Sequence, residues 1–160
     1  MQHDRHRSRI AREEIHHRAE SCRFIEGGDI LVTGREILVG RSARTNAAGI
    51  AELSSLVTPW GHQLREVHTP PGVLHFKTDC SLLDATTILA TDRLSASGCF
   101  AGYTVIPTAP GEEAAANAIR FNGLVLMAEG FPGTRANVER AGFTVVDLGI
   151  GVAIIGIFAA

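Results

Sequence analysis

The chain has 160 residues, which is enough for one compact domain and short for two. Hydrophobic residues make up 45% of the sequence and charged residues 20%, a balance that is typical of ordinary globular domains and excludes general disorder. The net charge of −2 includes no long block of like charges, so the composition argues against a nucleic-acid partner.

The cysteines and the apolar runs bear on the compartment. Cys22, Cys80 and Cys99 are an odd number without C-x-x-C spacing, and no histidine cluster stands beside them. We therefore expect a reducing, cytoplasmic location, and neither a metal nor another cofactor. The longest uncharged tract, 148–160, has 13 residues against the roughly 20 needed to cross a bilayer, so we expect no membrane association.

Residues 1–23 are polar, with a weak apolar stripe, and we expect a frayed helix or a flexible arm there. The remainder, 24–160, is predicted to form one domain. It reads as three repeats with boundaries near 24–70, 71–110 and 111–160, because one order of patterns recurs: strand, tight turn, strand, polar or helical stretch, strand.

In the first repeat, strands are predicted at 24–33, 36–39 and 63–68, with a helix that begins at Thr45 or Asn46 and ends near Pro59. In the second, the predicted strands are 73–83, 86–90 and 103–106, and the helix is the weakest element.

In the third repeat, the predicted strands are 115–121, 124–128 and 143–147, with a helix over 134–141 closed by Gly142. The turn Asn122-Gly123 is a strong hairpin signal. An ordinary α/β domain can give short strands in a similar order, but the ordered repetition favours ββαβ units.

Three segments could carry chemistry. Glu26-Gly27-Gly28-Asp29 interrupts the first predicted strand, and two adjacent glycines typically mark a bulge or a close backbone approach. A functional site is one interpretation. The other is that the glycines serve packing and that both carboxylates are solvated.

The second segment, HFKTDCS at 75–81, is predicted to be a strand. A period of two places His75, Lys77 and Asp79 on one face and Cys80 on the other. Such a face can line a polar cleft in which His75 exchanges protons near neutral pH. Alternatively, it is a solvent-facing edge.

The third segment, GRSARTN at 40–46, joins a predicted strand end to a helix start. An arginine in this position, Arg41 or Arg44, could bind a carboxylate with two guanidinium nitrogens, or both could be ordinary surface arginines.

Three stretches of the sequence resemble the dimethylarginine dimethylaminohydrolase family of the pentein, or guanidine-modifying, superfamily. They are IEGGDILVTGREILVGRSARTNAAG, VLHFKTDCSLLD and AANAIRFNGLVLMAEGFPGTR, and in this order they span roughly residues 24–147. Penteins are built from five ββαβ units around a pseudo-fivefold axis. The resemblance therefore implies an α/β pentein fold with about three of the five units in this chain, the last three.

The resemblance also implies roles for individual residues. His75 would be the active-site histidine, Glu26 the carboxylate that partners it, and Arg44 the arginine that holds the α-carboxylate of a methylated arginine. The related arginine deiminases carry an aspartate two positions after this histidine, where this chain has Lys77, and this favours the dimethylarginine branch. In that family a cysteine thiolate attacks the guanidinium carbon, dimethylamine leaves, and water releases citrulline.

No nucleophile is identified. The family's cysteine lies close to the carboxyl terminus, where this sequence reads GIGVAIIGIFAA. Cys80 is five residues from His75, so a regular strand would turn it to the opposite face. Cys22 lies roughly 13 Å from Glu26 along an extended strand, and Cys99 has no counterpart that we can place.

We therefore predict a dimethylarginine dimethylaminohydrolase-like protein that is inactive as the isolated chain. The rival hypothesis is a non-catalytic pentein module that binds an arginine-like ligand or a partner chain. Exposed sheet edges are expected to favour self-association in both cases.

Overall fold

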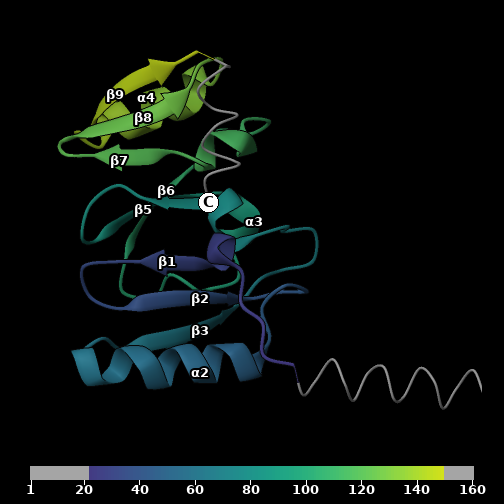
Figure 1. Ribbon diagram of the computed structural model, residues 1–160. Coiled ribbons are helices and arrows are strands. Elements are labelled where there is room, and N and C mark those ends of the chain that lie inside the picture. The colour runs from purple at the N-terminus through teal and green to yellow at the C-terminus, as the bar shows by residue number, and fades with distance from the viewer. Residues whose placement is uncertain (1–21, 150–160) are drawn as a thin grey trace, which may run out of the picture.

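Three small sheets follow one another along the chain in the computed structural model, which describes residues 22–149 (Figure 1). Most of the predicted polar arm, 1–23, and of the uncharged tract, 148–160, lies outside the described residues. Within residues 22–149, none of the helices has the length and apolar character needed to cross a membrane.

Each sheet has three strands, and all three sheets share one topology. The first strand pairs with the second antiparallel, and the second pairs with the third parallel. The strands are β1 (Ile30–Val32), β2 (Ile37–Arg41), β3 (Leu64–His68), β4 (Cys80–Leu82), β5 (Thr87–Ala90), β6 (Thr104–Pro107), β7 (Ile119–Phe121), β8 (Leu124–Ala128) and β9 (Thr144–Leu148).

The helices occupy corresponding places in the three units. In each unit an α-helix lies between the two parallel strands, and a short 3₁₀ helix precedes the first strand. The α-helices are α2 (Ala47–Val57), α3 (Asp92–Ser95) and α4 (Pro132–Arg140). The 3₁₀ helices before the first strands are η1 (Gly27–Asp29), η3 (Phe76–Thr78) and η4 (Glu113–Ala116). A further 3₁₀ helix, η2 (Thr58–Trp60), directly follows α2. The repeated order is that of the ββαβ unit.

Local signals account for several boundaries. Asn46 caps α2, because its side-chain oxygen accepts the N–H of Gly49 at 2.8 Å. Asn122 turns the β7–β8 hairpin with a φ of 54°, which confirms the hairpin predicted from Asn-Gly. Helix α4 begins at Pro132, two residues before its predicted start, since proline is well suited to a first helical turn.

The core fills the spaces between consecutive sheets. One cluster joins the first sheet to the second and includes Leu38, Phe76 and Ile88, all with no exposed surface. A second cluster joins the second sheet to the third and includes Leu89 and Met127. Burial across both junctions explains why the three units stack as successive layers (Figure 1).

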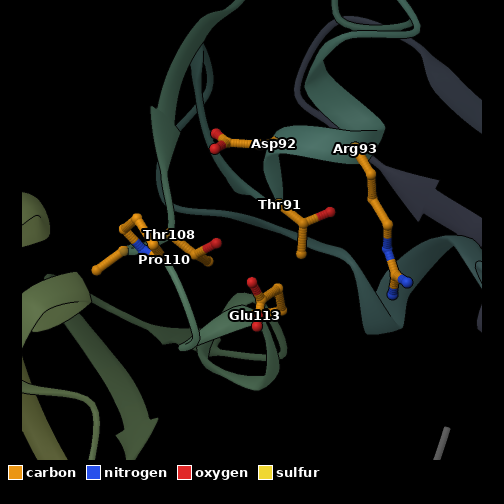
Figure 2. Close-up of a pocket in the computed structure, with 7 residues that line it drawn as sticks. Thr91, Asp92, Arg93, Thr108, Pro110 and Glu113 are labelled. Carbon is orange, nitrogen blue, oxygen red and sulfur yellow. The ribbon is translucent and has the colours of Figure 1, made fainter.

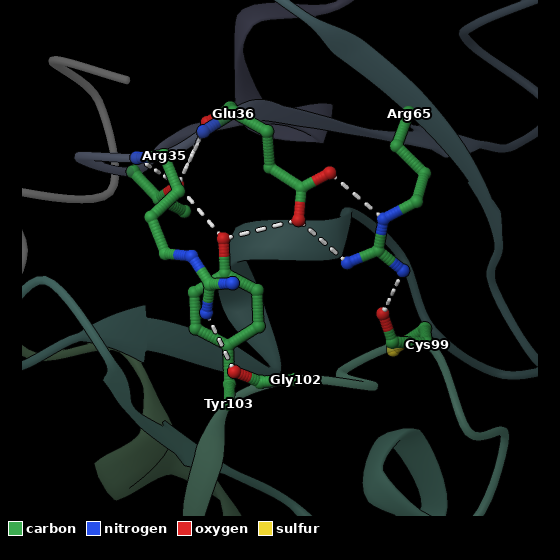
Figure 3. Close-up of polar contacts among 7 residues, drawn as sticks. Arg35, Glu36, Arg65, Cys99, Gly102 and Tyr103 are labelled. Carbon is green, nitrogen blue, oxygen red and sulfur yellow. Dashed lines mark hydrogen bonds and ion pairs between the residues drawn. The ribbon is translucent and has the colours of Figure 1, made fainter.

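Polar contacts reinforce the junction between the first two sheets (Figure 3). The Glu36 carboxylate accepts hydrogen bonds from Nε and Nη2 of Arg65 at 2.9 and 2.8 Å and from the Tyr103 hydroxyl at 3.1 Å. The Arg65 guanidinium holds the pKa of the Glu36 carboxyl below its usual value. Arg35 adds a hydrogen bond to the carbonyl of Gly102 at 2.8 Å.

Candidate functional site

The candidate site is organised by a buried aspartate. Asp29 ends η1, has no exposed surface, and accepts three hydrogen bonds with its carboxylate. Oδ2 accepts from the hydroxyls of Ser42 and Thr45, both at 2.7 Å, and Oδ1 accepts from the backbone N–H of Phe76 at 2.9 Å. One side chain therefore ties η1 to the β2–α2 loop and to η3.

The β2–α2 loop is a tight turn that holds Arg44 outward. Ser42 and Thr45 exchange backbone hydrogen bonds of 3.2 and 3.4 Å, and the N–H of Arg44 donates to the Ser42 hydroxyl at 3.0 Å. Because Ser42 and Thr45 are both bound to Asp29, the backbone of Arg44 is fixed while its side chain stays exposed.

Arg44 and His75 are in direct contact. Nη1 of Arg44 lies 2.8 Å from Nε2 of His75. A guanidinium can only donate, so Nε2 is the acceptor and the neutral ring carries its proton on Nδ1. The sequence-predicted arginine and histidine are thus brought together from different units.

Glu26 lies next to the same group. Its backbone N–H donates to the Thr45 hydroxyl at 3.0 Å, and its carbonyl accepts the N–H of Asp29 at 2.9 Å. The His75 ring packs over Gly28, where an added Cβ would lie 3.0 Å from Cγ of the ring. Among the hydrogen bonds of residues 22–149, none joins the Glu26 carboxylate to His75, so this predicted partnership stays a prediction.

The predicted strand over 75–81 is wrong for residues 75–79. His75 precedes the 3₁₀ helix η3, and β4 begins only at Cys80. The backbone N–H groups of this turn are paired without a neighbouring strand. The N–H of Thr78 donates to the carbonyl of His75 at 3.1 Å, and the N–H of Phe76 donates to the Asp29 carboxylate. The predicted strand over 24–33 is shortened for the same reason, since η1 occupies its middle and β1 is only Ile30–Val32.

Two of the three cysteines are shielded from solvent. Cys80 and Cys99 are buried, and burial raises the pKa of both thiols, well above the usual value for Cys80. The Cys80 thiol donates to the carbonyl of Phe76 at 3.3 Å. Cys80 therefore lies in the core. Its exclusion as the nucleophile was based on the alternation of side chains along a strand from His75, and no such strand exists between the two residues. Cys22 is exposed.

Asp29 is the important residue that the sequence analysis missed, because one interpretation left it as a solvated carboxylate. A signal for it exists in the repeat. Asp79 stands at the matching position before β4, is 3% exposed, and binds the Thr91 hydroxyl at 3.1 Å and the guanidinium of Arg93. Aligning GGDILV with KTDCSL would have indicated a buried structural aspartate in both units.

The donor set does not suggest a metal centre. Among residues 22–149, no three or more histidine, cysteine, aspartate or glutamate side chains are grouped so that they could hold a metal ion. The candidate site is instead a histidine in contact with an arginine, with the backbone of Glu26 beside them, and such a pair is suited to binding a carboxylate and moving a proton.

Comparison with known proteins gives a consistent picture. No protein-family model matches the chain. It is 32% identical over 131 residues to N(G),N(G)-dimethylarginine dimethylaminohydrolase of Pseudomonas aeruginosa, covering 82% of this chain and 51% of that protein. It is 33% identical over 129 residues to the protein of the same name from Streptomyces coelicolor, covering 79% of this chain and 48% of that one. The chain spans about half the length of these curated relatives.

Solved structures agree. A cysteine-to-serine mutant of the Pseudomonas aeruginosa enzyme, complexed with citrulline, superposes with a TM-score of 0.74 at 31% identity over 80% of this chain and 50% of that one. An amidinotransferase from Microseira wollei shares the fold, with a TM-score of 0.69 at 16% identity over 81% of this chain and 43% of the other.

The successive ββαβ units and their likeness to these structures define an α/β protein of the pentein superfamily, with about half of the complete fold in this chain. Within that superfamily, the chain belongs to the dimethylarginine dimethylaminohydrolase family.

Proposed function

We propose that Glu26, Arg44 and His75 form one part of a binding site for N-methylated arginine, and that the 160-residue chain alone does not hydrolyse this ligand. The observation that carries the proposal is the contact of Arg44 with His75 at 2.8 Å, held in place by the buried Asp29. The similarity to two dimethylarginine dimethylaminohydrolases supports the choice of ligand.

Arg44 has the chemistry to bind the α-carboxylate of the amino acid. In the structure its Nη1 donates to an uncharged imidazole nitrogen. A carboxylate is a stronger acceptor for a guanidinium, because both partners are charged and two parallel hydrogen bonds can form. A bound carboxylate would draw Arg44 away from His75 and leave Nε2 free.

A free Nε2 is what the family reaction requires of a histidine. In that reaction a thiolate bonds to the guanidinium carbon, the carbon–nitrogen bond to dimethylamine breaks, and the leaving nitrogen takes a proton. Water then releases citrulline and the thiol. His75 would first take the thiol proton at Nε2 and deliver it to the leaving amine, and it would later accept a proton from water and return it to the departing sulfur.

The thiolate is the part for which this chain offers no good candidate. Cys80 and Cys99 are buried thiols with raised pKa values, and Cys22 is exposed. Among the hydrogen bonds of residues 22–149, none joins any of the three thiols to Arg44, His75 or Asp29. Loss of a nucleophile can remove on the order of 10⁶ in rate even where the rest of a site survives. The chain would then act as a binding module, which is the rival hypothesis of the sequence analysis.

Assays of dimethylamine and citrulline release test the proposal. The full chain and a variant with Cys22→Ser, Cys80→Ser and Cys99→Ser are compared with dimethylarginine as substrate, and we expect no turnover by either. Citrulline should bind saturably, and Arg44→Gln should weaken this binding by about tenfold, while Arg140→Gln serves as a surface control. Turnover by the parent that disappears in the triple variant would contradict the proposal.

A further inference from the structure

The junction between the first two units joins two different kinds of sheet face. In the first unit, α2 packs through Ile50 on one face of the sheet. Leu31 and Leu38 lie on the other face, which we call the helix-free face. They pack in one cluster with Ile88 of the second sheet and with Leu94 of α3. The helix-free face of the first sheet is therefore covered by the helix side of the second unit, meaning α3 and the sheet face that it shares.

The junction between the second and third units repeats this arrangement. Leu89 and Ile106 are direct partners on the helix-free face of the second sheet. They pack in the other cluster with Val125 of the third sheet and with Val138 of α4. In both junctions, what covers a helix-free face is the helix side of the next unit.

The helix-free face of the third sheet is apolar and exposed. The register places Phe121 opposite Leu124, Ile119 opposite Leu126, and Leu126 beside Val146, so all five side chains share this face. The exposed fractions are 49% for Ile119, 60% for Phe121, 36% for Leu124 and 38% for Val146. The strand residues on this face include no charged side chain. An exposed apolar patch of this kind is typical of an interaction surface.

The helix side of the first unit is the matching surface at the opposite end of the stack (Figure 1). Val32 shares the sheet face on which α2 packs and is 59% exposed, Leu56 of α2 is 62% exposed, and Trp60 of η2 is 82% exposed. Three exposed large hydrophobic residues therefore lie here and four on the third sheet, out of nine in residues 22–149. Apolar exposure is concentrated at the two ends of the stack.

The cavity beside α3 is a different kind of surface. Its volume is ≈ 440 Å³, it lies between 91–93 and 108–113, and Asp92, Arg93 and Glu113 contribute to its lining (Figure 2). An apolar partner would have to remove water from these charged groups, which costs free energy. An apolar partner therefore fits the two ends of the stack and not this cavity.

We propose that a second copy of this chain binds head to tail, with the helix side of its first unit on the helix-free face of the third sheet. The two internal junctions show that this kind of contact forms in this fold, and each end surface is what the other lacks. A closed head-to-tail pair would bury both kinds of end surface, whereas two third sheets packed face to face would leave Leu56 and Trp60 exposed.

Sedimentation velocity of the full chain over a range of concentrations tests this proposal. We expect the average mass to rise with concentration, and Phe121→Glu or Leu56→Glu should each weaken self-association by at least about tenfold. Leu74→Glu is the matched control, because Leu74 is 60% exposed and lies on neither end surface, and it should leave self-association unchanged. Thermal unfolding confirms that each variant is folded.

Mixing the two weakened variants gives the sharpest outcome. Phe121→Glu retains the helix side of the first unit, and Leu56→Glu retains the helix-free face of the third sheet. An equimolar mixture should therefore form pairs of one copy of each, held by one intact contact. A parent chain that stays monomeric, a Leu56→Glu variant that self-associates like the parent, a mixture that forms no pairs, or a Leu74→Glu variant that is weakened as much would each overturn the proposal.

Discussion

Oδ1 of Asp29 accepts the backbone N–H of Phe76 at 2.9 Å, a contact that bridges 47 positions of sequence. Phe76 directly follows His75, and the other oxygen of Asp29 binds Ser42 and Thr45, which flank Arg44. The hydrogen bonds that close the first unit against the second are therefore also those that set the distance between Arg44 and His75.

Replacing Asp29 should destabilise the fold and disturb the site together. Asp29→Ala leaves two hydroxyls and one N–H without their acceptor in a buried position, and we expect a loss of about 3–5 kcal/mol in the free energy of unfolding. Asp29→Asn keeps an acceptor and should lose less, about 1–3 kcal/mol. Urea denaturation measures both, and an effect no larger than that of the exposed Glu129→Gln would contradict the role given to Asp29.

Two glycines make a matched pair for testing the packing of the same junction. A Cβ added at Gly40 would lie 2.7 Å from Cβ of Phe76, whereas at Gly27 it would meet nothing within 4 Å. Gly40→Ala should therefore cost about 1–3 kcal/mol of stability through overpacking, and Gly27→Ala should be close to neutral. Chemical denaturation of the two variants decides, and equal effects would mean that β2 and η3 are not packed as described.

The Glu36–Arg65 pair predicts a pH dependence. Arg65 lowers the pKa of Glu36 below its usual value of 4.5, so the folded state binds this proton less tightly than the unfolded state. The stabilisation is present above the unfolded pKa and is lost as pH falls through the folded pKa. Glu36→Gln should remove about 1–2 kcal/mol at neutral pH and flatten the loss of stability between about pH 6 and pH 3.

The matched control for this experiment is Glu66→Gln. Glu66 pairs with Arg41 at 3.3 Å, and half of the Arg41 side chain is exposed. An exposed pair of this kind contributes about 0–1 kcal/mol, so the acid transition of this variant should follow that of the parent. Identical acid transitions for the parent and Glu36→Gln would contradict the prediction.

The three thiols should differ in reactivity. Cys22 is exposed, while Cys80 and Cys99 are buried with raised pKa values, and only an accessible thiolate reacts with a disulfide reagent. We expect one fast thiol in the native chain and three after unfolding in denaturant. Cys22→Ser should abolish the fast phase, and a second fast thiol in the native state would show that one of the buried cysteines is open to solvent.

Much of the fold could be predicted from the sequence because the units are built from local signals. Asn122-Gly123 predicts its hairpin, and Asn46 was one of two candidates for the cap that begins α2. The repeated order of patterns predicted the ββαβ units, and the resemblance of the three quoted stretches implied the pentein class; the structure and its likeness to solved structures confirm both.

The 3₁₀ turns were not predicted, because their residues give no helical or alternating pattern over so few positions. His75 and Asp79 were assigned to one face of a strand, but η3 separates them, and Asp79 is buried while His75 is partly exposed. The backbone of this segment is fixed by the distant Asp29, and a hydrogen bond across 47 positions leaves no trace in local propensity. The pairing of Arg44 with His75 followed only once the loops were placed in three dimensions.

The tautomer of the His75 ring tests most directly the claim that Arg44 and His75 form one site. Nitrogen-15 NMR of the full chain with labelled histidine, assigned through His75→Gln, reports which ring nitrogen carries the proton. At a pH where the ring is neutral, the account predicts a proton on Nδ1 and none on Nε2, because Nε2 accepts from Arg44. Citrulline should then shift the Nε2 resonance in the parent and leave it unchanged in Arg44→Gln. A proton on Nε2, or a resonance that citrulline does not move in the parent, would contradict the site proposed for this chain.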